Sequence, residues 1–370
     1  MSEQDSSEKK SVEHFQFECK QCGFELDHEI GQNSLVCQSC GAVEPIDSQS
    51  FNVFQANPYE STVLNLVQDE PNEVRHHVRC ETCGAGFDFP KDTHADECPY
   101  CGTNIIVPVN LQRQLLPDAV IPFDIAEEQA NKSFRKWIKS LWFAPNSLKR
   151  LAIRKHPIQG TYIPYWGFDA NTYSQYTGQR GTNYTTTIRV ATVVNGKMVM
   201  KNQTVVKIRW RYVSGNVAHE FDNVLVPASE LISNKLTASM KIWNLEKSQE
   251  YSPKFLSGYR SELYQVGLPR GFGYSKNIMK KFITRLVRRD IGGDHQRISS
   301  LDTRYERVGF KLLLMPLWVS AFLYNKKTFR FIINGQTGEV KGERPYSWIK
   351  IVSLILFIAS IVGTGIYFAR

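Results

Sequence analysis

Four Cys-x-x-Cys-Gly motifs in the first third of the chain constrain its fold more than any other feature. They form two matching pairs, and fourteen residues separate the two motifs of each pair. The motifs contain all eight cysteines of the protein: Cys19, Cys22, Cys37 and Cys40, then Cys80, Cys83, Cys98 and Cys101. Structural Zn²⁺ takes four tetrahedral ligands, and two such motifs supply four thiolates. We therefore expect two zinc ribbons, each holding one structural Zn²⁺.

The glycine after each second cysteine fits this interpretation. Glycine tolerates a positive φ, which lets backbone amides turn toward the sulfurs; these glycines are Gly23, Gly41, Gly84 and Gly102. A segment this short has no core of its own, so metal binding, about 10–16 kcal/mol in zinc-finger peptides, would supply most of its folding energy. A four-thiolate site leaves no open position for water, so catalytic zinc is not expected.

A disulfide framework is the alternative for the eight cysteines. Disulfides are typical of secreted chains, and the polar, charged start MSEQDSSEKK is not a signal peptide. We favour the metal. The histidines near the motifs are expected to be solvated loop residues rather than ligands: His28, His76, His77 and His94.

The C-terminal segment from Ile351 to Phe368 contains eighteen residues without a charge. As a helix it is long enough to cross about 27 Å of hydrocarbon. Trp348 and Tyr367 stand where interfacial aromatic residues are expected. A buried core helix is the alternative, but a core helix usually keeps a polar face. We expect a single-pass membrane anchor.

The flanks of this segment predict its orientation. Lys341, Arg344 and Lys350 precede it, whereas only Ala369 and Arg370 follow it. Lys and Arg favour the cytoplasmic side of a membrane, and eight reduced cysteines favour the same compartment. The bulk of the chain is thus expected in the cytoplasm, tethered to the cell membrane by its C-terminal end.

Charge is distributed unevenly along the chain. Residues 1–75 hold fourteen acidic and four basic residues, a net charge of −10 within an overall net charge of +9, so the remainder carries +19. An acidic first ribbon is poorly suited to DNA, which requires Lys and Arg against phosphate. It is better suited to a basic protein partner.

A basic run marks an expected helix from Tyr274 to Arg289. Spacings of three to five residues place many of its cations on one face. A solvated surface, contact with anionic lipid headgroups near the anchor and contact with nucleic acid all remain open for these residues, which are Lys276, Lys280, Lys281, Arg285, Arg288 and Arg289.

The periodicity between the motifs and the anchor predicts an α+β domain with a mainly antiparallel sheet. Asp124 is expected to cap a helix from Ile125 to Trp142, and a further helix is expected over 228–245. Asn195-Gly196 predicts a hairpin turn within a β-rich stretch, and 214–216 predicts a second turn. Later strands, 312–324 and 327–334, should pair through residues 325 and 326.

The predicted organisation has six parts. They are a disordered N-terminus (1–14), zinc ribbon 1 (15–44), a linker (45–75), zinc ribbon 2 (76–107), an α+β cytosolic domain (108–346) and a transmembrane tail anchor (347–370).

Candidate catalytic groups are few. Asp294, His295 and Arg297 follow two glycines and could form an acid–base pair, but a helix C-cap with local pairing of Asp294 and Arg297 is favoured. His219 and Glu220 would face opposite ways on a strand. The aromatic run Tyr162–Trp166 is expected to pack in the core. No phosphate-binding loop, nucleophile elbow or HExxH motif occurs, so we do not expect an enzyme.

Several longer motifs carry a resemblance. The paired CxxCG motifs, WFAP at 142–145, YIPYWGFDA at 162–170, IGGDHQRI at 291–298 and NGQTGEVKGERPYS at 334–347 resemble the YdjG-like group. These are bacterial membrane-anchored double zinc-ribbon proteins, often labelled TFIIB-type zinc ribbon or primosomal protein N′-like. The resemblance implies a membrane-tethered ribbon protein linked to an SPFH-domain partner and to PspA-type membrane-stress proteins. It supplies no catalytic residues.

Two main functions are therefore expected to compete. The first is a membrane-anchored scaffold that recruits protein partners to the cytoplasmic membrane face. The second is nucleic-acid binding, related to replication or transcription and without helicase activity, through the second ribbon and the basic helix. An enzyme that uses Asp294, His295 and Arg297 is a third, weaker interpretation.

Overall fold

The structure is a computed structural model of the 370-residue chain. It describes residues 16–51, 55–67, 76–80, 86–89, 93–98, 103–106, 115–147, 158–194, 197–230, 236, 239–240, 243–324 and 327–368.

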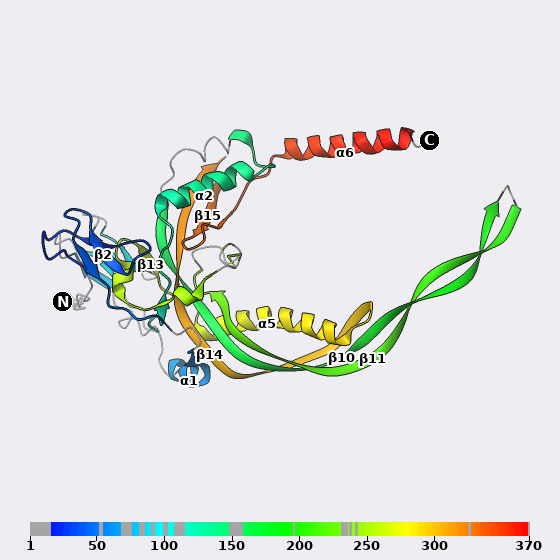
Figure 1. Ribbon diagram of the computed structural model, residues 1–370, viewed down its shortest axis with the longest axis horizontal. Coiled ribbons are helices and arrows are strands. Elements are labelled where there is room, and N and C mark those ends of the chain that lie inside the picture. The colour runs from blue at the N-terminus through cyan, green and yellow to red at the C-terminus, as the bar shows by residue number, and fades with distance from the viewer. Residues whose placement is uncertain are drawn as a thin grey trace, which may run out of the picture.

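A large, mostly antiparallel sheet organises the molecule (Figure 1). Its central strand β10 (Gln159–Val194) pairs with β14 (His295–Tyr324) along one edge and with β11 (Lys197–Pro227) along the other. Two pairings are parallel, β10 with β13 (Arg260–Glu262) and β14 with β9 (Ala119–Val120). The expected α+β class with a mainly antiparallel sheet is confirmed.

The three long strands form a curved arm that leaves the body (Figure 1). β10 has 36 residues, β11 has 31 and β14 has 30, whereas a mean strand has about 5–6. β14 accompanies β10 only as far as the pair Gly181–His295. From Thr182 to Val194, β10 pairs with β11 alone. We call this two-stranded part the distal arm.

Bulges occur where the arm joins the body. The register of β10 shifts at Phe168/Ala170 against β11 and between residues 169 and 171 against β14. The neighbouring Asn223 has a φ of 52°, which is unusual for a residue with a side chain. A fully buried ammonium group fills this junction: Lys311 Nζ donates to Asp169 Oδ2 at 2.6 Å and to Asn223 Oδ1 at 2.8 Å.

Helix α5 (Leu268–Ile291) covers the concave face of the arm (Figure 1). Its buried residues Phe272, Met279, Ile283 and Val287 pack with Phe168 and other apolar side chains of the sheet. The helix begins six residues before the expected start at Tyr274, because Pro269 suits a first turn. At Gly271 a Cβ would lie 2.7 Å from the Trp166 ring, so this added first turn makes a close helix–sheet contact.

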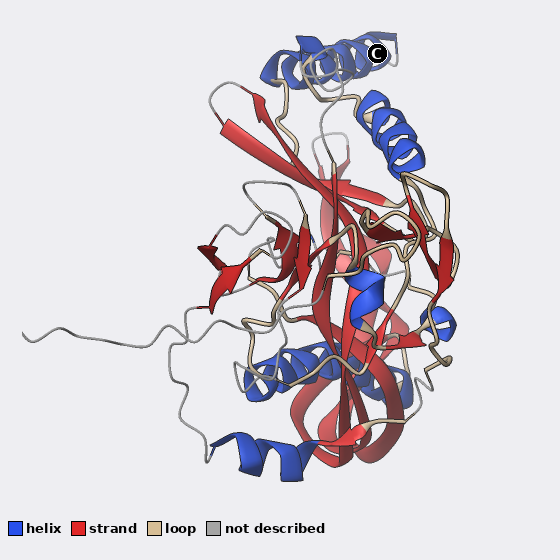
Figure 2. Ribbon diagram, turned by 90° about the vertical axis from the view of Figure 1, so that its left-hand side faces the viewer, coloured by secondary structure: helices blue, strands red, loops and turns tan. Residues whose placement is uncertain are grey.

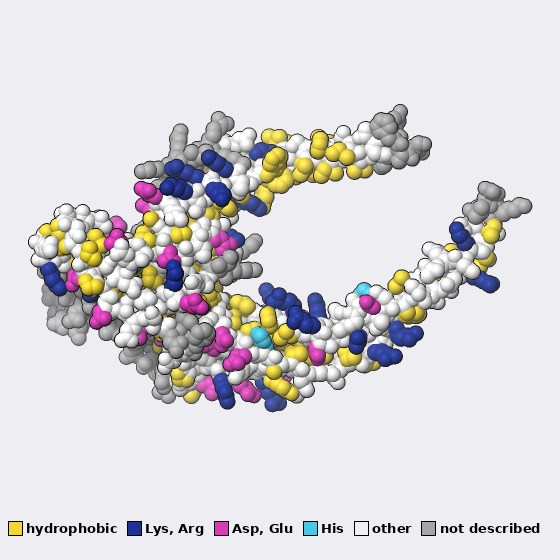
Figure 3. Space-filling model, viewed as in Figure 1, with side chains coloured by type: hydrophobic (Ala, Val, Ile, Leu, Met, Phe, Trp, Pro, Cys, Tyr) yellow, Lys and Arg dark blue, Asp and Glu magenta, His cyan; other side chains and the backbone are white. Residues whose placement is uncertain are grey.

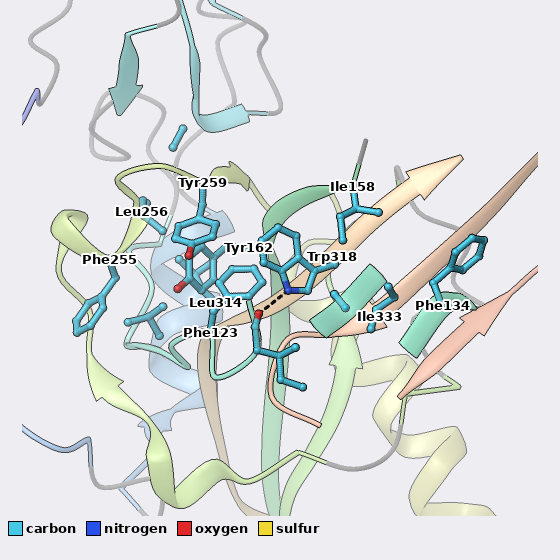
Figure 4. Packing of buried hydrophobic residues seen from close by; sticks show 14 of the residues in the cluster. Phe123, Phe134, Ile158, Tyr162, Phe255, Leu256, Tyr259, Leu314, Trp318 and Ile333 are labelled. Carbon is cyan, nitrogen blue, oxygen red and sulfur yellow. Dashed lines mark hydrogen bonds between the residues drawn. The ribbon is translucent and has the colours of Figure 1, made fainter. Parts of the chain in front are cut away.

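The core of the body is aromatic (Figure 4). The Phe123 ring stacks on Tyr259 with centroids 4.5 Å apart and packs against Tyr162 and Trp318. The Trp318 indole donates to the Ile125 carbonyl at 2.9 Å. The expected core packing of the aromatic run 162–166 is confirmed, because Tyr162, Tyr165 and Trp166 are fully buried.

Helix α2 (Glu127–Ser140) packs beside β15 (Lys327–Asn334) and β16 (Val340–Gly342). The expected cap by Asp124 is wrong, since this carboxylate accepts a hydrogen bond from Lys247 Nζ at 2.8 Å and the helix begins after Ala126. β14 and β15 pair up to Tyr324 and Lys327, as expected. The turn residues 325 and 326 lie outside the described residues.

Two other predicted elements differ from those in the structure. The turn at 214–216 is wrong, because β11 runs through it and Gly215 pairs with Tyr176. A Cβ at Gly215 would lie 2.7 Å from the Tyr176 hydroxyl, so this glycine marks a close approach rather than a turn. The helix expected over 228–245 is not helical at Ala228–Glu230, and most of its middle lies outside the described residues. The hairpin predicted at 195–196 agrees with the pair Val194–Lys197, although the turn itself is not described.

Short elements from the N-terminal part surround the body. A three-stranded sheet contains β1 (Leu26–His28), β2 (Ser34–Cys37) and β3 (Val43–Pro45). The segment expected to be a linker contains β4 (Asn57–Pro58), which pairs with β14, and α1 (Tyr59–Val67). Tyr59 and Val63 of α1 pack against the apolar cluster that α5 forms with the long strands. This contact lies at the end of the sheet opposite α2 (Figure 2).

The segment of the second motif pair joins the main sheet in part. Strand β7 (Thr93–Glu97) pairs with β13 and with β8 (Asn104–Ile106), whereas β5 (His76–Arg79) and β6 (Gly86–Phe89) form a separate hairpin. The remaining short elements are η2 (Leu245–Lys247), β12 (Gln249–Glu250) and η3 (Pro253–Leu256).

The last helix, α6 (Trp348–Phe368), projects from the body (Figure 1). Its window Trp348–Gly365 is long and apolar enough to cross a membrane, and none of it is buried. The expected apolar C-terminal helix is confirmed, and the buried-core alternative is wrong. Lys350 Nζ holds the start of α6 through hydrogen bonds to the Ala144 carbonyl and Asn146, both at 2.8 Å.

Candidate metal centre

The two motifs of the first pair form the same backbone turn. The Cys19 amide donates to the Phe24 carbonyl at 2.6 Å, and the Cys37 amide donates to the Ala42 carbonyl at 2.9 Å. Gly23 and Gly41 close the turns with φ values of 71° and 75°. The prediction of positive φ at these two glycines is confirmed; Gly84 and Gly102 lie outside the described residues.

The four sulfurs of Cys19, Cys22, Cys37 and Cys40 form one cluster, with all Sγ atoms within 4.8 Å of one another. The Cys19–Cys40 and Cys22–Cys37 Sγ atoms are 3.6 and 3.5 Å apart. Tetrahedral Zn²⁺ with Zn–S bonds of about 2.3 Å requires sulfurs about 3.8 Å apart. None of the described cysteines forms a disulfide. The cluster is therefore close to the geometry of one tetrahedral metal site.

The electrostatics of the cluster also call for a cation. Hydrogen bonding from the Cys40 backbone lowers the pKa of Cys37 to about 7. Although the Ala42 amide acts in the opposite direction, contacts with the Cys22 and Cys19 thiols raise the pKa of Cys40 to about 12. The Cys22 and Cys19 thiols thus oppose the ionisation of Cys40, and a bound cation would favour its thiolate.

The ribbon is fixed to the body rather than free. Leu26 and Leu35 between the two motifs are buried in the same core as Phe255 and Tyr259. The Ser257 hydroxyl donates to the Leu26 carbonyl at 2.6 Å. As expected, the ribbon has no separate core. Its buried side chains belong to the core of the body.

The second set of cysteines is described only in part. Cys80 and Cys98 are buried and pack with Val78 and Ile105. The Cys98 amide donates to the Thr103 carbonyl at 2.7 Å, which repeats the turn of the first pair. Cys83 and Cys101 lie outside the described residues. The structure therefore places two of the four predicted ligands of this set and leaves the second metal site as a prediction.

An acidic cleft lies where the first ribbon meets the body. Its volume is about 1010 Å³, and it contains no Lys or Arg among its described lining residues. Five carboxylates line it, those of Asp27, Glu29, Glu97, Asp124 and Glu127. Burial, assisted by the charge of Glu97, raises the pKa of Asp27. The sequence predicted the acidity of the ribbon but not this cleft, because Glu97, Asp124 and Glu127 come from distant segments.

Two histidines expected on solvated loops are buried, which corrects that prediction. His28 is 4% exposed on β1 and lines the cleft, and His94 is 2% exposed on β7. Burial lowers the pKa of His28 to about 4. A His94 ring nitrogen lies 2.5 Å from the Tyr251 hydroxyl. Neither belongs to the sulfur cluster, and the side chains of His76 and His77 are not described.

The six basic residues of α5 are exposed, and dark-blue side chains gather over this helix in Figure 3. Lys276 Nζ lies 4.4 Å from the Phe272 ring centroid, and the Arg285 guanidinium lies 5.1 Å from that of Phe282. Within the described part of the chain, none of the six forms an ion pair. They thus offer an exposed cationic surface, and its ligand stays a prediction.

Asp294 and His295 both contact Asn183 at the surface. Asp294, His295 and Arg297 are exposed. Asp294 accepts from the Asn183 amide at 2.7 Å and Arg297 stacks over Trp210 at 4.1 Å, so the expected pairing between them is wrong. Gly292 caps α5, as expected. His219 stacks on Phe282 with centroids 4.5 Å apart.

Comparison with known proteins adds one relative. The chain is 27% identical over 348 residues to the uncharacterized protein YdjG of Bacillus subtilis (strain 168). The alignment covers 93% of this chain and 94% of that protein. No protein-family model and no solved structure matches the chain. The similarity therefore extends over most of the chain, and it assigns no activity.

Proposed function

We propose that the protein is a membrane-anchored zinc-ribbon adaptor, in which α6 fixes the chain in the bilayer and the ribbon end recruits a basic protein partner. The observation that carries this proposal is the placement of the two ends. The first ribbon lies at one end of the molecule, whereas α6 projects from the other (Figure 1). An anchored molecule would thus present its ribbon away from the lipid.

Zinc has a structural role in this proposal. Cys19, Cys22, Cys37 and Cys40 hold one ion, and four thiolates leave no coordination position for a substrate. The second set of four cysteines holds another ion. The repeated turn at Cys98 and the buried packing of Cys80 support this second site.

The surroundings of α6 support the anchor. Exposed aromatic side chains, Trp142, Tyr346 and Trp348, lie in the segments that meet at the start of α6, where an interfacial belt would lie. Lys341, Arg344 and Lys350 come from the same region, so we propose that the body lies in the cytoplasm and that α6 leads out of it.

The acidic cleft is the proposed docking site. Asp124 is paired with Lys247, but within the described residues the other four carboxylates of the cleft form no ion pair and complement a Lys- or Arg-rich segment. SPFH-domain and PspA-type membrane-stress proteins are the partners that the resemblance implies. Recruitment requires no catalytic group, in keeping with our expectation that the protein is not an enzyme.

Co-purification from solubilised membranes tests the proposal. The full chain with Glu29→Lys and Glu97→Lys reverses two charges of the cleft, and Glu60→Lys with Glu306→Lys is the control on exposed carboxylates elsewhere. We expect the cleft variant to lose its partners and the control to keep them, with equal zinc content. Unchanged recovery by the cleft variant would overturn the docking site.

Nucleic-acid binding is the second candidate, and the unpaired cations of α5 are the observation that favours it. Retention of the purified protein on duplex DNA at low salt, with release as salt rises, would support it. Absence of retention at low salt would remove it.

A further inference from the structure

The distal arm has no structural partner of its own. From Thr182 opposite Arg209 to Val194 opposite Lys197 it is a two-stranded ribbon. At ~3.3 Å per residue it extends about 40 Å beyond the last pair with β14. An isolated two-stranded ribbon is marginal in water, so a bound surface would stabilise this one.

The strand segments that form the distal arm carry cations and no acidic residue. No Asp or Glu occurs from Asn171 to His219, whereas this stretch contains Arg180, Arg189, Lys197, Lys201, Lys207, Arg209 and Arg211. Lys197 apart, none of these residues forms an ion pair within the described part of the chain. The Arg209 guanidinium instead lies 5.0 Å from the centroid of the Tyr184 ring. An anionic surface is the complementary partner for such an arm.

One face of the distal arm carries exposed apolar side chains near the tip. Met198 is 79% exposed and Met200 is 62% exposed. They pair with Val193 and Ala191 and share one face of the ribbon, because side chains alternate along a strand. The next pair toward the body on this face contains Arg189. Along this face, apolar groups nearer the tip with a cation behind them match the order of hydrocarbon and phosphate in a bilayer.

The arm and α6 leave the body on the same side (Figure 1). Figure 3 shows yellow side chains along α6 and near the end of the arm, with dark-blue side chains between that end and the body. A bilayer spanned by α6 would lie at the end of the molecule toward which the arm extends. The tip would therefore meet the same membrane.

We propose that the distal arm is a second membrane contact, which inserts Met198 and Met200 into the interfacial region of an anionic leaflet and places Arg189 and Lys201 against lipid phosphates. The ribbon does not cross the bilayer, because its outer edges carry unpaired backbone groups that hydrocarbon cannot satisfy. Duplex nucleic acid would match the cations but offers no hydrocarbon for the two methionines. A second copy of the arm would be repelled, because both arms are cationic. The inference rests on α6 as the anchor in the proposed function.

Photo-crosslinking of the full chain tests this contact. A benzophenone amino acid replaces Met198, and the protein is reconstituted into vesicles with or without phosphatidylglycerol. A matched control carries the same group at Tyr212, which is 87% exposed but lies nearer the body. We expect lipid adducts at position 198, few at position 212, and a higher yield with phosphatidylglycerol.

Charge variants sharpen the test. Arg189→Gln or Lys201→Gln should each lower the adduct yield at position 198 about fivefold in anionic vesicles, the value expected for one cation near such a surface. Equal lipid adducts at positions 198 and 212, adducts to protein, or no adduct at position 198 would each overturn the proposal. Retention of the arm on DNA without lipid adducts would do the same.

The anchor is measured separately by alkaline extraction of the vesicles. If α6 keeps the protein in the membrane and position 198 yields no lipid adduct, the arm contact fails and the anchor stands. If the protein is extracted although lipid adducts form at position 198, the anchor fails and the arm contact stands.

Discussion

The first ribbon and the distal arm are stabilised in opposite ways. The ribbon strands β1 and β2 have three and four residues, yet Leu26 and Leu35 are buried at 2% and 1% exposure. The distal arm belongs to strands of 36 and 31 residues, yet most of its described side chains are exposed. Strand length is therefore a poor guide to burial here, because the short ribbon strands share the body core and the distal arm does not.

The two regions also differ in charge. Five carboxylates line the cleft beside the ribbon, whereas the strands of the distal arm carry cations and no acidic residue. The overall net charge of +9 conceals this separation. This separation is the basis for proposing a basic protein partner at one end and an anionic surface at the other.

The largest effect is expected at the ribbon. Cys37→Ser removes one of four ligands and should abolish one zinc site, since metal binding contributes about 10–16 kcal/mol to folding of zinc-finger peptides. Bound zinc, measured by elemental analysis, should fall by one ion per chain, and protease should cleave the ribbon before the arm. Gln38→Ser in the same motif is the control. Unchanged zinc content in Cys37→Ser would contradict the assignment.

The second largest effect is expected at the base of the arm. Lys311→Met leaves the Asp169 carboxylate without its buried partner and should cost about 3–5 kcal/mol of unfolding free energy. Urea unfolding followed by tryptophan fluorescence measures this loss, and adding Asp169→Asn should recover most of it. The exposed Lys20–Glu44 pair is the control, since Lys20→Met should change nothing measurable. Equal effects at the two pairs would show that burial does not decide the outcome.

A smaller effect concerns the acid stability of the ribbon end. The unfolded chain protonates His28 as pH falls through about 6.5, whereas the folded chain resists until about pH 4. Stability present above pH 6.5 is thus lost between these values, by up to about 3 kcal/mol. His28→Leu should unfold with a shallower pH dependence in urea titrations at constant zinc content. An identical dependence in both proteins would argue against a neutral buried histidine.

The smallest effect on stability is expected at the arm tip. Met198→Gln with Met200→Gln should change the free energy of unfolding by less than about 0.5 kcal/mol, because both side chains are exposed. Leu35→Ala in the ribbon is the buried comparison and should cost about 2–5 kcal/mol. A large loss in the tip variant would mean that the tip packs against another part of the protein.

Local spacing was enough to predict the sulfur cluster and α6. Two motifs with a fixed separation can meet on one ion, and an uninterrupted apolar segment needs no partner to be identified. The arm was harder to predict. Gly215 indicated a turn by its residue type, and only its contact with Tyr176 shows why a strand contains it. The buried Lys311 carried no signal at all, since its partners lie 142 and 88 residues away in the sequence.

By itself, the sequence determined the first sulfur cluster, the apolar C-terminal helix and the mainly antiparallel α+β class, because each depends on residue type and short-range periodicity. Tertiary structure decided the rest. It joined the ribbon to the body core, brought five distant carboxylates into one cleft, buried His28 and let β14 stop short of the arm tip. These features depend on contacts between segments that are distant in the sequence, and the packing of the whole chain determines those contacts.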